Sequence, residues 1–243
     1  MKFSKKLGQH ILIDRGVVSR IIRYAELKRT DTVLEVGCGT GILTEQLLKH
    51  AGKVYGIEKD KRFVKLLENK FLGEINEGKF VLIEGDALKV EWPEFNKFVS
   101  NIPYQISSEL TFRLLKRKYE LAVVMYQKEF AERLVARSGK KYGRLSVVAR
   151  AYATIKILEH VKAEAFRPKP KVDSSIVIIK PIPEINVKNM ESFEKLVREA
   201  FSSRRKKFGK TAEKLGIDVP EDLKNERPER IPPEVFAELS KRL

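Results

Sequence analysis

A four-residue segment, Asn101-Ile102-Pro103-Tyr104, combines an amide, a rigid proline and an aromatic ring. These residue types suit the binding of a planar ring that carries an amino group, since the amide oxygen accepts a hydrogen bond and the aromatic face offers a stacking surface. The segment follows the apolar run 97–100, which we interpret as a buried strand. Open α/β sheets place their ligand crevice at the carboxyl ends of the strands. We therefore expect the segment to line a binding crevice.

The chemistry that best explains this segment is methyl transfer to the exocyclic nitrogen of adenine. That nitrogen is a poor nucleophile because its lone pair is shared with the ring. The Asn101 side-chain oxygen and the Ile102 carbonyl are candidates to accept its two hydrogens and free the lone pair, and Pro103 would keep the turn rigid. Stacking on Tyr104 would contribute roughly 1–3 kcal/mol, and positioning would supply most of the rate effect. The alternative is a strand-terminating turn with a packed tyrosine.

A glycine-rich turn, Gly37, Gly39 and Gly41, follows another predicted strand. Glycines let backbone N–H groups approach a ligand closely. A dinucleotide fingerprint needs its third glycine at position 42, which is isoleucine. The turn therefore indicates a nucleotide-like ligand of another kind.

Two acidic residues end the next two predicted strands. Glu58 lies 17 residues past Gly41, where a carboxylate can accept ribose hydroxyls, and Asp86 could accept from an adenine amine. Each acid alone could equally be a cap or a solvated residue. Together with the turn they indicate a methyl donor in one half of the crevice and a target adenine in the other. Cys38, within the turn, is interpreted as a small residue that fits a tight bend.

Alternating strand and helix patterns position these residues. Asp14 and Asp60 are predicted N-caps, and Ser107 or Ser108 a third. The pattern predicts an α/β fold with a doubly wound, largely parallel sheet, whose two late strands form an antiparallel edge hairpin. Beyond Pro183 we expect a small helical domain, 184–243. The predicted strands are 32–36, 53–57, 79–83, 97–100, 120–125, 154–161 and 174–180, and the predicted helices are 14–26, 42–50, 60–71, 107–116, 127–137 and 143–151.

Composition narrows the class of protein. Among 243 residues, Lys and Arg number 49 and Asp and Glu 33, so the net charge is +16. This excess favours a polyanionic partner such as nucleic acid, although it could serve solubility alone. No apolar run reaches the roughly 18 residues of a membrane span. A signal-peptide pattern is missing and there is one cysteine, so we expect a cytoplasmic protein without a disulfide or a cysteine-rich metal site.

Eight sequence blocks extend the pattern over residues 7 to about 210. They are LGQHILID (7–14), EVGCGTG (35–41), GIE (56–58), EGDA (84–87), NIPYQISS (101–108), YGRLS (142–146), FRPKPKVDS (166–174) and FSSRRK (201–206). In these blocks the chain resembles the rRNA adenine N6-dimethyltransferases of the KsgA/Dim family, and its archaeal and eukaryotic branch in particular.

The resemblance implies a Rossmann-like class I methyltransferase domain, 1–183, and a helical rRNA-contacting domain, 184–243. It implies S-adenosyl-L-methionine as methyl donor. The implied targets are two adjacent adenosines near the 3′ end of the small-subunit rRNA, dimethylated by a monomer acting on an assembling subunit.

The resemblance also assigns residues. The implied donor contacts are Gln9, His10, Leu12, Gly37, Gly39, Gly41, Glu58, Asp86, Ala87 and Asn101. The implied target-base residues are Asn101, Ile102, Pro103, Tyr104 and Phe166, with Phe166 closing the second face of the base. A basic segment favours rRNA phosphate contact, through Arg198, Arg204, Arg205, Lys206, Lys207 and Lys210. A second candidate patch comprises Arg137, Lys140, Lys141 and Arg144.

Two other functions stay open at this point. An Erm-type large-subunit rRNA methylase shares most of the motifs, although 105–108 and 172–174 favour the small-subunit branch. A non-catalytic assembly factor that only binds rRNA is the alternative from another class. An intact Asn101-to-Tyr104 segment argues against it.

Overall fold

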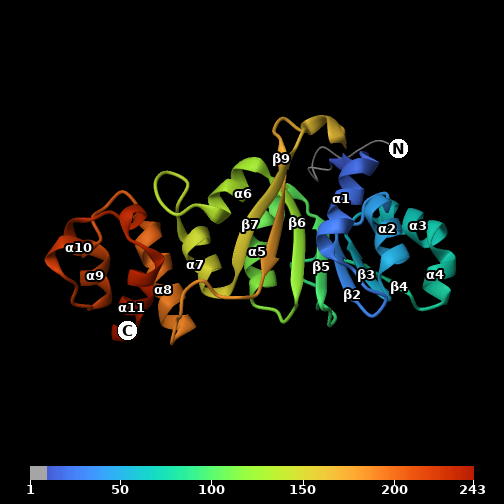
Figure 1. Cartoon of the computed structure of the whole chain (residues 1–243). Coiled ribbons are helices and arrows are strands. Elements are labelled where there is room, and N and C mark those ends of the chain that lie inside the picture. Colours follow the sequence, from blue (N-terminus) through green and yellow to red (C-terminus); the bar gives the residue numbers. More distant parts are fainter. Residues whose placement is uncertain (1–9) are drawn as a thin grey trace. The chain divides into compact units, whose positions relative to one another are not determined.

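The computed structural model describes residues 10–243, which form two compact units (Figure 1). Unit 1 comprises residues up to 131 together with 156–181, and unit 2 comprises 132–155 together with 182–243. The sequence placed 132–155 with the first domain. The segment joins unit 2 instead because its helix buries an apolar face against the C-terminal helices. No helix among residues 10–243 is long and apolar enough to cross a bilayer.

Unit 1 is built on a seven-stranded sheet in the order β4-β3-β2-β5-β6-β9-β7. The pairs among β2 to β6 are parallel, whereas β9 runs antiparallel to β6. This confirms the mostly parallel sheet with the two late strands together at one edge. The strands are β2 Thr32–Val36, β3 Lys53–Glu58, β4 Phe80–Glu84, β5 Lys97–Asn101, β6 Leu121–Gln127, β7 Thr154–Val161 and β9 Ser174–Lys180.

Helices cover this sheet, and their caps follow the sequence in two of three cases. The Asp14 carboxylate accepts from the backbone N–H groups of Gly16 and Val17, and Asp60 accepts from that of Arg62. The predicted serine cap is wrong: the 3₁₀ turn Tyr104–Ile106 leads directly into α5, and Ser107 is already a buried helical residue. The helices are α1 Arg15–Ala25, α2 Ile42–His50, α3 Lys61–Lys70, α4 Leu72–Asn76, α5 Ser107–Leu115 and α6 Lys128–Val135.

A second, two-stranded sheet joins distant segments of unit 1. Strand β1 (Ile11–Leu12) pairs antiparallel with β8 (Phe166–Arg167), and the Ile13 N–H donates to the Ala165 carbonyl at 2.8 Å. No pattern in the sequence predicts this pairing, since a two-residue strand is too short to show a periodicity.

Unit 2 is helical, as expected beyond residue 184. Its core buries Phe193, Phe208 and Phe236, and the Tyr142 hydroxyl donates to the Ile231 carbonyl at 2.9 Å. Its helices are α7 Arg144–Tyr152, α8 Met190–Ser202, α9 Gly209–Leu215, α10 Glu221–Asn225 and α11 Pro233–Leu239.

Candidate active site

A pocket opens in unit 1 at the carboxyl ends of β2, β3, β4 and β5. It brings together donor-side and target-side residues that sequence reasoning selected separately. The predicted residues that line it are His10, Leu12, Gly37, Gly39, Glu58, Asp86, Ala87, Asn101, Ile102, Pro103 and Tyr104. Parallel strands end at one edge of the sheet, which is why residues so distant in sequence meet here.

Three predicted residues lie elsewhere or outside the described chain. Gly41 caps α2 at φ 76°, and a Cβ there would lie 2.7 Å from the Phe71 ring, so this glycine permits helix packing. Phe166 is 3% exposed and packs in the core beside Leu12, and it is not among the residues that line the pocket. Its proposed place over the target base therefore stays a prediction. Gln9 precedes the described residues.

The glycine turn contacts the target segment directly. Gly37 adopts φ 77°, and its N–H donates to the Ile57 carbonyl at 2.8 Å. A Cβ on Gly37 would lie 3.1 Å from Pro103 Cδ. A larger residue would therefore both strain the turn and push the two halves of the pocket apart.

Glu58 is a rigid acceptor at the end of β3. It is 7% exposed, and its carboxylate accepts backbone N–H groups from Gly39 at 2.9 Å, Lys59 at 2.9 Å and Asp60 at 2.8 Å. Burial raises its pKa, and these backbone donors oppose the rise. A carboxylate offers about four acceptor positions. The group therefore keeps part of its capacity for a ligand hydroxyl.

Asp86, beyond the end of β4, is held in its ionised form. The Lys59 ammonium lies 2.9 Å from Asp86 Oδ2, and the Leu88 N–H donates to Oδ1 at 3.0 Å. These two hydrogen bonds hold the pKa of Asp86 below its ordinary value. An ionised carboxylate at the pocket wall can accept from an amine.

Asn101, on the target side of the pocket, has a buried side-chain oxygen that indicates a ligand contact. It ends β5, and its Oδ1 is buried without a hydrogen-bond partner in the described part of the chain. Leaving a buried polar atom unpaired costs about 1–3 kcal/mol. The cost is explained if this oxygen, in the pocket wall, accepts from a ligand.

Tyr104 is fixed at its hydroxyl and covered on one face. The hydroxyl lies 2.7 Å from Ser174 Oγ, at the start of β9. The His10 ring stacks on Tyr104 with 5.8 Å between centroids, and His10 Nδ1 lies 2.7 Å from the Pro168 carbonyl. A base would therefore use the opposite face of Tyr104.

Sequence reasoning missed several contributors to this pocket. Ile11, Glu35 and Lys59 line it, and Ser174 holds Tyr104. Ile11 lies between two assigned residues, and Glu35 and Lys59 directly adjoin the glycine turn and Glu58, so neighbouring positions were the available signal. Ser174 could not be found from spacing, because only the fold brings it to Tyr104.

Glu35 lies buried beneath the turn, 1% exposed, and accepts from the Thr44 hydroxyl at 2.6 Å. Burial raises the pKa of Glu35 to about 7. Burial likewise raises the pKa of the Cys38 thiol, which is 5% exposed, in keeping with a small packed residue.

We expect a pH-dependent stability from Glu35. Between pH 4.5, its ordinary pKa, and about 7, the folded chain keeps a proton that the unfolded chain loses, so stability falls as pH rises. The free energy of unfolding of the wild type relative to Glu35→Gln should fall by about 3 kcal/mol over this range. Urea unfolding of both proteins at several pH values measures the difference. A constant difference would mean that Glu35 titrates normally.

Comparison with known proteins gives the family. The family model described as ribosomal RNA adenine dimethylase matches residues 1–228. The chain belongs to this family. It is 50% identical to the probable ribosomal RNA small subunit methyltransferase A of Pyrococcus furiosus. The alignment spans 227 residues and covers 90% of this chain and 81% of the relative. Its identity to the Methanosarcina barkeri protein of the same description is 42%, over 96% of this chain and 85% of the relative.

Solved structures agree with the fold of this dimethylase. A dimethyladenosine transferase from Plasmodium falciparum superimposes with a TM-score of 0.79 at 31% identity, covering 95% of this chain and 96% of the other. The 23S rRNA methyltransferase ErmE superimposes with a TM-score of 0.73 at 27% identity, covering 96% and 99%. The chain is an rRNA adenine dimethylase with a mostly parallel methyltransferase sheet and a helical C-terminal region.

Proposed function

We propose that this dimethylase transfers methyl groups from S-adenosylmethionine to N6 of two adjacent adenosines near the 3′ end of the small-subunit rRNA, two per base. The observation that carries the proposal is the buried, unpaired Asn101 Oδ1, in the same pocket as Tyr104 and the glycine turn. We further propose that it acts in the cytoplasm, as a monomer, on an assembling small subunit.

The donor-side residues fit S-adenosylmethionine. The glycine turn allows close backbone approach, Glu58 has remaining acceptor capacity for a ribose hydroxyl, and Asp86 is ionised to receive the adenine amine. When bound, the donor supplies a methyl group on a positively charged sulfur. The protein's task is then to hold this methyl group and the target nitrogen in line.

On the target side, the chain contributes acceptors and a stacking face. The Asn101 side-chain oxygen and the Ile102 carbonyl accept hydrogen bonds from the two N6 hydrogens, while the base stacks on Tyr104. The methylated nitrogen is acidic and sheds its proton, so no strong base is needed. One hydrogen remains after the first transfer, which keeps an acceptor engaged for the second.

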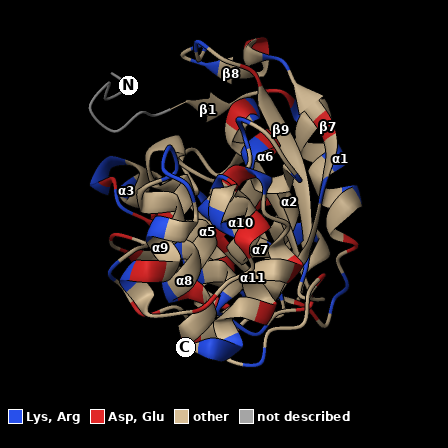
Figure 2. Cartoon of the chain, turned by 90° about the vertical axis from the view of Figure 1, so that its left-hand side faces the viewer, with Lys and Arg blue, Asp and Glu red and all other residues tan. Residues whose placement is uncertain are grey.

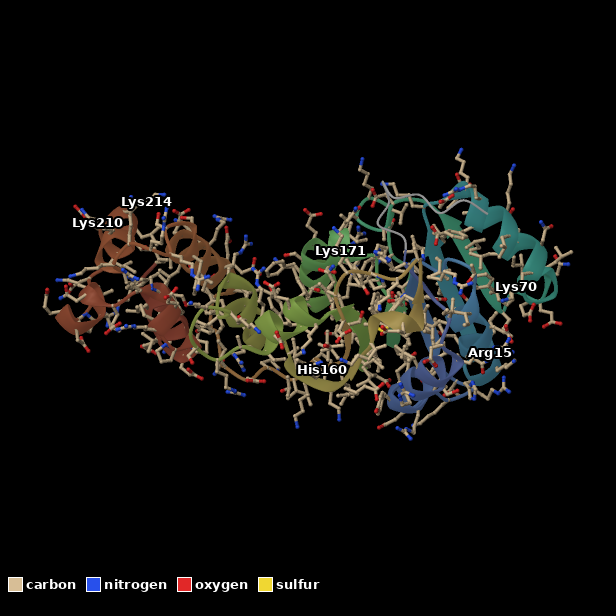
Figure 3. All side chains as sticks on the ribbon, turned by 90° about the horizontal axis from the view of Figure 1, so that it is seen from above. Arg15, Lys70, His160, Lys171, Lys210 and Lys214 are labelled. Carbon is tan, nitrogen blue, oxygen red and sulfur yellow. The ribbon has the colours of Figure 1, made fainter. Side chains whose placement is uncertain are left out.

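The proposed RNA contacts of unit 2 differ in their surroundings. Arg205, Lys206 and Lys210 are exposed, and Lys210 and Lys214 are labelled on α9 in Figure 3. Lys and Arg alternate with Asp and Glu on α8 and α9 (Figure 2). Arg204 is instead half-buried, and its guanidinium binds Glu229 at 2.8 Å and the Lys140 carbonyl at 2.9 Å. We therefore propose that Arg204 mainly braces unit 2.

The remaining assigned cations are exposed, like Arg205 and Lys206. Arg198 and Arg144 are exposed, on α8 and at the start of α7. Lys207 is also exposed, and its ammonium donates to the Asn225 side chain at 2.8 Å. Their assignment to phosphate contact stays a proposal.

We expect charge removal to separate phosphate contacts from the brace. Arg205→Ala and Lys206→Ala should each weaken RNA binding and reduce the slope of log affinity against log salt by about 0.7–0.9. Arg204→Ala should lower the melting temperature and leave the salt slope nearly unchanged. Filter binding across a salt series and thermal unfolding supply the two readouts. An unchanged slope in both exposed-residue variants would contradict phosphate contact there.

The function is tested with labelled donor and two substrates, immature small subunits and naked large-subunit RNA. The proposal predicts incorporation into small subunits well above that of heat-inactivated protein. Preferential labelling of large-subunit RNA would instead support an Erm-type activity, which the likeness to ErmE keeps as a second candidate. The many small-subunit methyltransferases among the relatives favour the first outcome.

A further inference from the structure

The turn 86–90, which follows β4 and contributes Asp86 and Ala87 to the pocket, is held from outside by an arginine. Arg113, on α5, donates from Nη1 to the Ala87 carbonyl at 2.9 Å and from Nη2 to the Val90 carbonyl at 2.5 Å. The planar guanidinium presents two donors in a fixed geometry. It thereby fixes two carbonyls of one turn at once.

Trp92 holds the same turn, and Arg113 and Trp92 together form what we call the clamp. Its buried indole Nε1–H also donates to the Ala87 carbonyl, at 2.8 Å, and the Arg113 guanidinium lies 4.8 Å from the centre of the Trp92 ring. The ring stacks on Phe98 of β5 at 5.7 Å. The turn is therefore tied to the central sheet as well as to α5.

The end of the turn, at Val90, packs closely against its beginning, at Gly85 and Asp86. A Cβ on Gly85 would lie 2.4 Å from Val90 Cγ1, so only glycine fits this approach. The backbone N–H groups of Lys89 and Val90 both donate to the Asp86 carbonyl, at 2.8 and 2.9 Å. Asp86 therefore lies in a closed turn with little freedom of its own.

One peptide group connects the clamp to the Asp86 side chain. The Ala87 carbonyl and the Leu88 N–H belong to the same peptide plane, and this N–H donates to Asp86 Oδ1 at 3.0 Å. Fixing the carbonyl fixes the direction of the N–H, and a cation at the carbonyl polarises the peptide and strengthens the donor. The other oxygen of Asp86 is held by Lys59, whose side chain is 62% exposed. The rigid anchor of the carboxylate is therefore the one that Arg113 and Trp92 supply.

We propose that Arg113 is a positioning residue for recognition of the donor's adenine: through the 87–88 peptide it aims the Asp86 carboxylate at the adenine amine. The inference rests on the proposed function, because it takes S-adenosylmethionine as the donor. Arg113 is not among the residues that line the pocket, so it acts on the donor through this peptide group. Its effect is a selectivity for an amine over a carbonyl at that position of the purine.

The test measures binding of S-adenosylhomocysteine and of its inosine analogue, which has an oxygen in place of the amine, by calorimetry. Arg113→Met should weaken binding of the adenine ligand about 10-fold and change the analogue little, so the preference for adenine shrinks. Arg113→Lys keeps the charge without the two-donor geometry and should lie between. Arg117→Met is the matched control, since Arg117 is exposed and lies 6.0 Å from the same Trp92 ring. It should bind both ligands as the wild type does.

Equal weakening of both ligands, or unchanged binding of both, would overturn the inference. A lower melting temperature with an unchanged adenine preference would do the same, because it would reduce Arg113 to a packing residue. Should Arg113→Met fail to fold, Arg113→Lys decides by the same ratio. A wild type that binds no S-adenosylhomocysteine would overturn the proposed function itself, a result distinct from wild-type binding that Arg113 does not influence.

Discussion

Asn101→Ala should lower the rate of methyl transfer by about 100- to 1000-fold, as loss of one preorganised group at a reacting centre does elsewhere. The variant removes the buried oxygen that has no partner in the described chain, and with it one of two acceptors for the N6 hydrogens. The target nitrogen would then stay planar and poorly nucleophilic. Protein stability should not fall in proportion, because the substitution also removes an unsatisfied polar atom.

Single-turnover transfer and urea unfolding of the same protein measure the two effects separately. Asn96→Ala is a suitable control. Asn96 is an amide residue that directly precedes the start of β5, and its side chain accepts from the Thr32 N–H at 2.8 Å and donates to Asp31 at 2.8 Å. It should cost stability and leave transfer largely intact. If Asn101→Ala transferred methyl groups as fast as Asn96→Ala, the assigned acceptor would be wrong.

Tyr104→Ala should lower kcat/KM for the RNA substrate by about 10- to 100-fold, because stacking of one base on an aromatic ring is worth roughly 1–3 kcal/mol. Donor affinity should change much less, since the expected loss lies on the target side. Tyr104→Phe keeps the ring and removes only the hydroxyl that meets Ser174 at 2.7 Å. It should cost no more than a few fold.

Steady-state kinetics with varied RNA, together with donor binding, distinguish base support from packing. Equal losses of donor binding and transfer in Tyr104→Ala would show that the ring mainly fills space. The same reading would follow if Tyr104→Phe were as impaired as Tyr104→Ala, because the ring face would then not be what matters.

The regular elements of the sheet were predictable because each has a strong local signal. Apolar β-branched runs mark strands such as β2 and β9, and a side-chain acceptor such as Asp14 marks the start of a helix. The pairing of β1 with β8 has no local signal, since only tertiary contacts create it. Ser107 failed as a cap for a related reason: a 3₁₀ turn enters α5, so the helix begins at Ser107 itself, one residue before a Ser107 cap would start it.

The same distinction explains which site residues were predicted. Asn101, Glu58 and Asp86 were found because the carboxyl ends of parallel strands meet at one edge. The burial of Phe166 beside Leu12 and the bracing of Arg204 by Glu229 depend on contacts between segments far apart in sequence. Composition alone could not distinguish a braced arginine from one that is exposed.

We propose above all that the pocket around Asn101 binds an extruded adenine and that the enzyme methylates the amine of this base there. Immature small subunits should be incubated with wild-type protein or Asn101→Ala, and the rRNA nucleosides then mapped by mass spectrometry. The account predicts N6,N6-dimethyladenosine at two adjacent positions near the 3′ end with the wild type, and almost none with the variant. Dimethylation by the variant at the wild-type level, or modification of a different nucleoside, would contradict it.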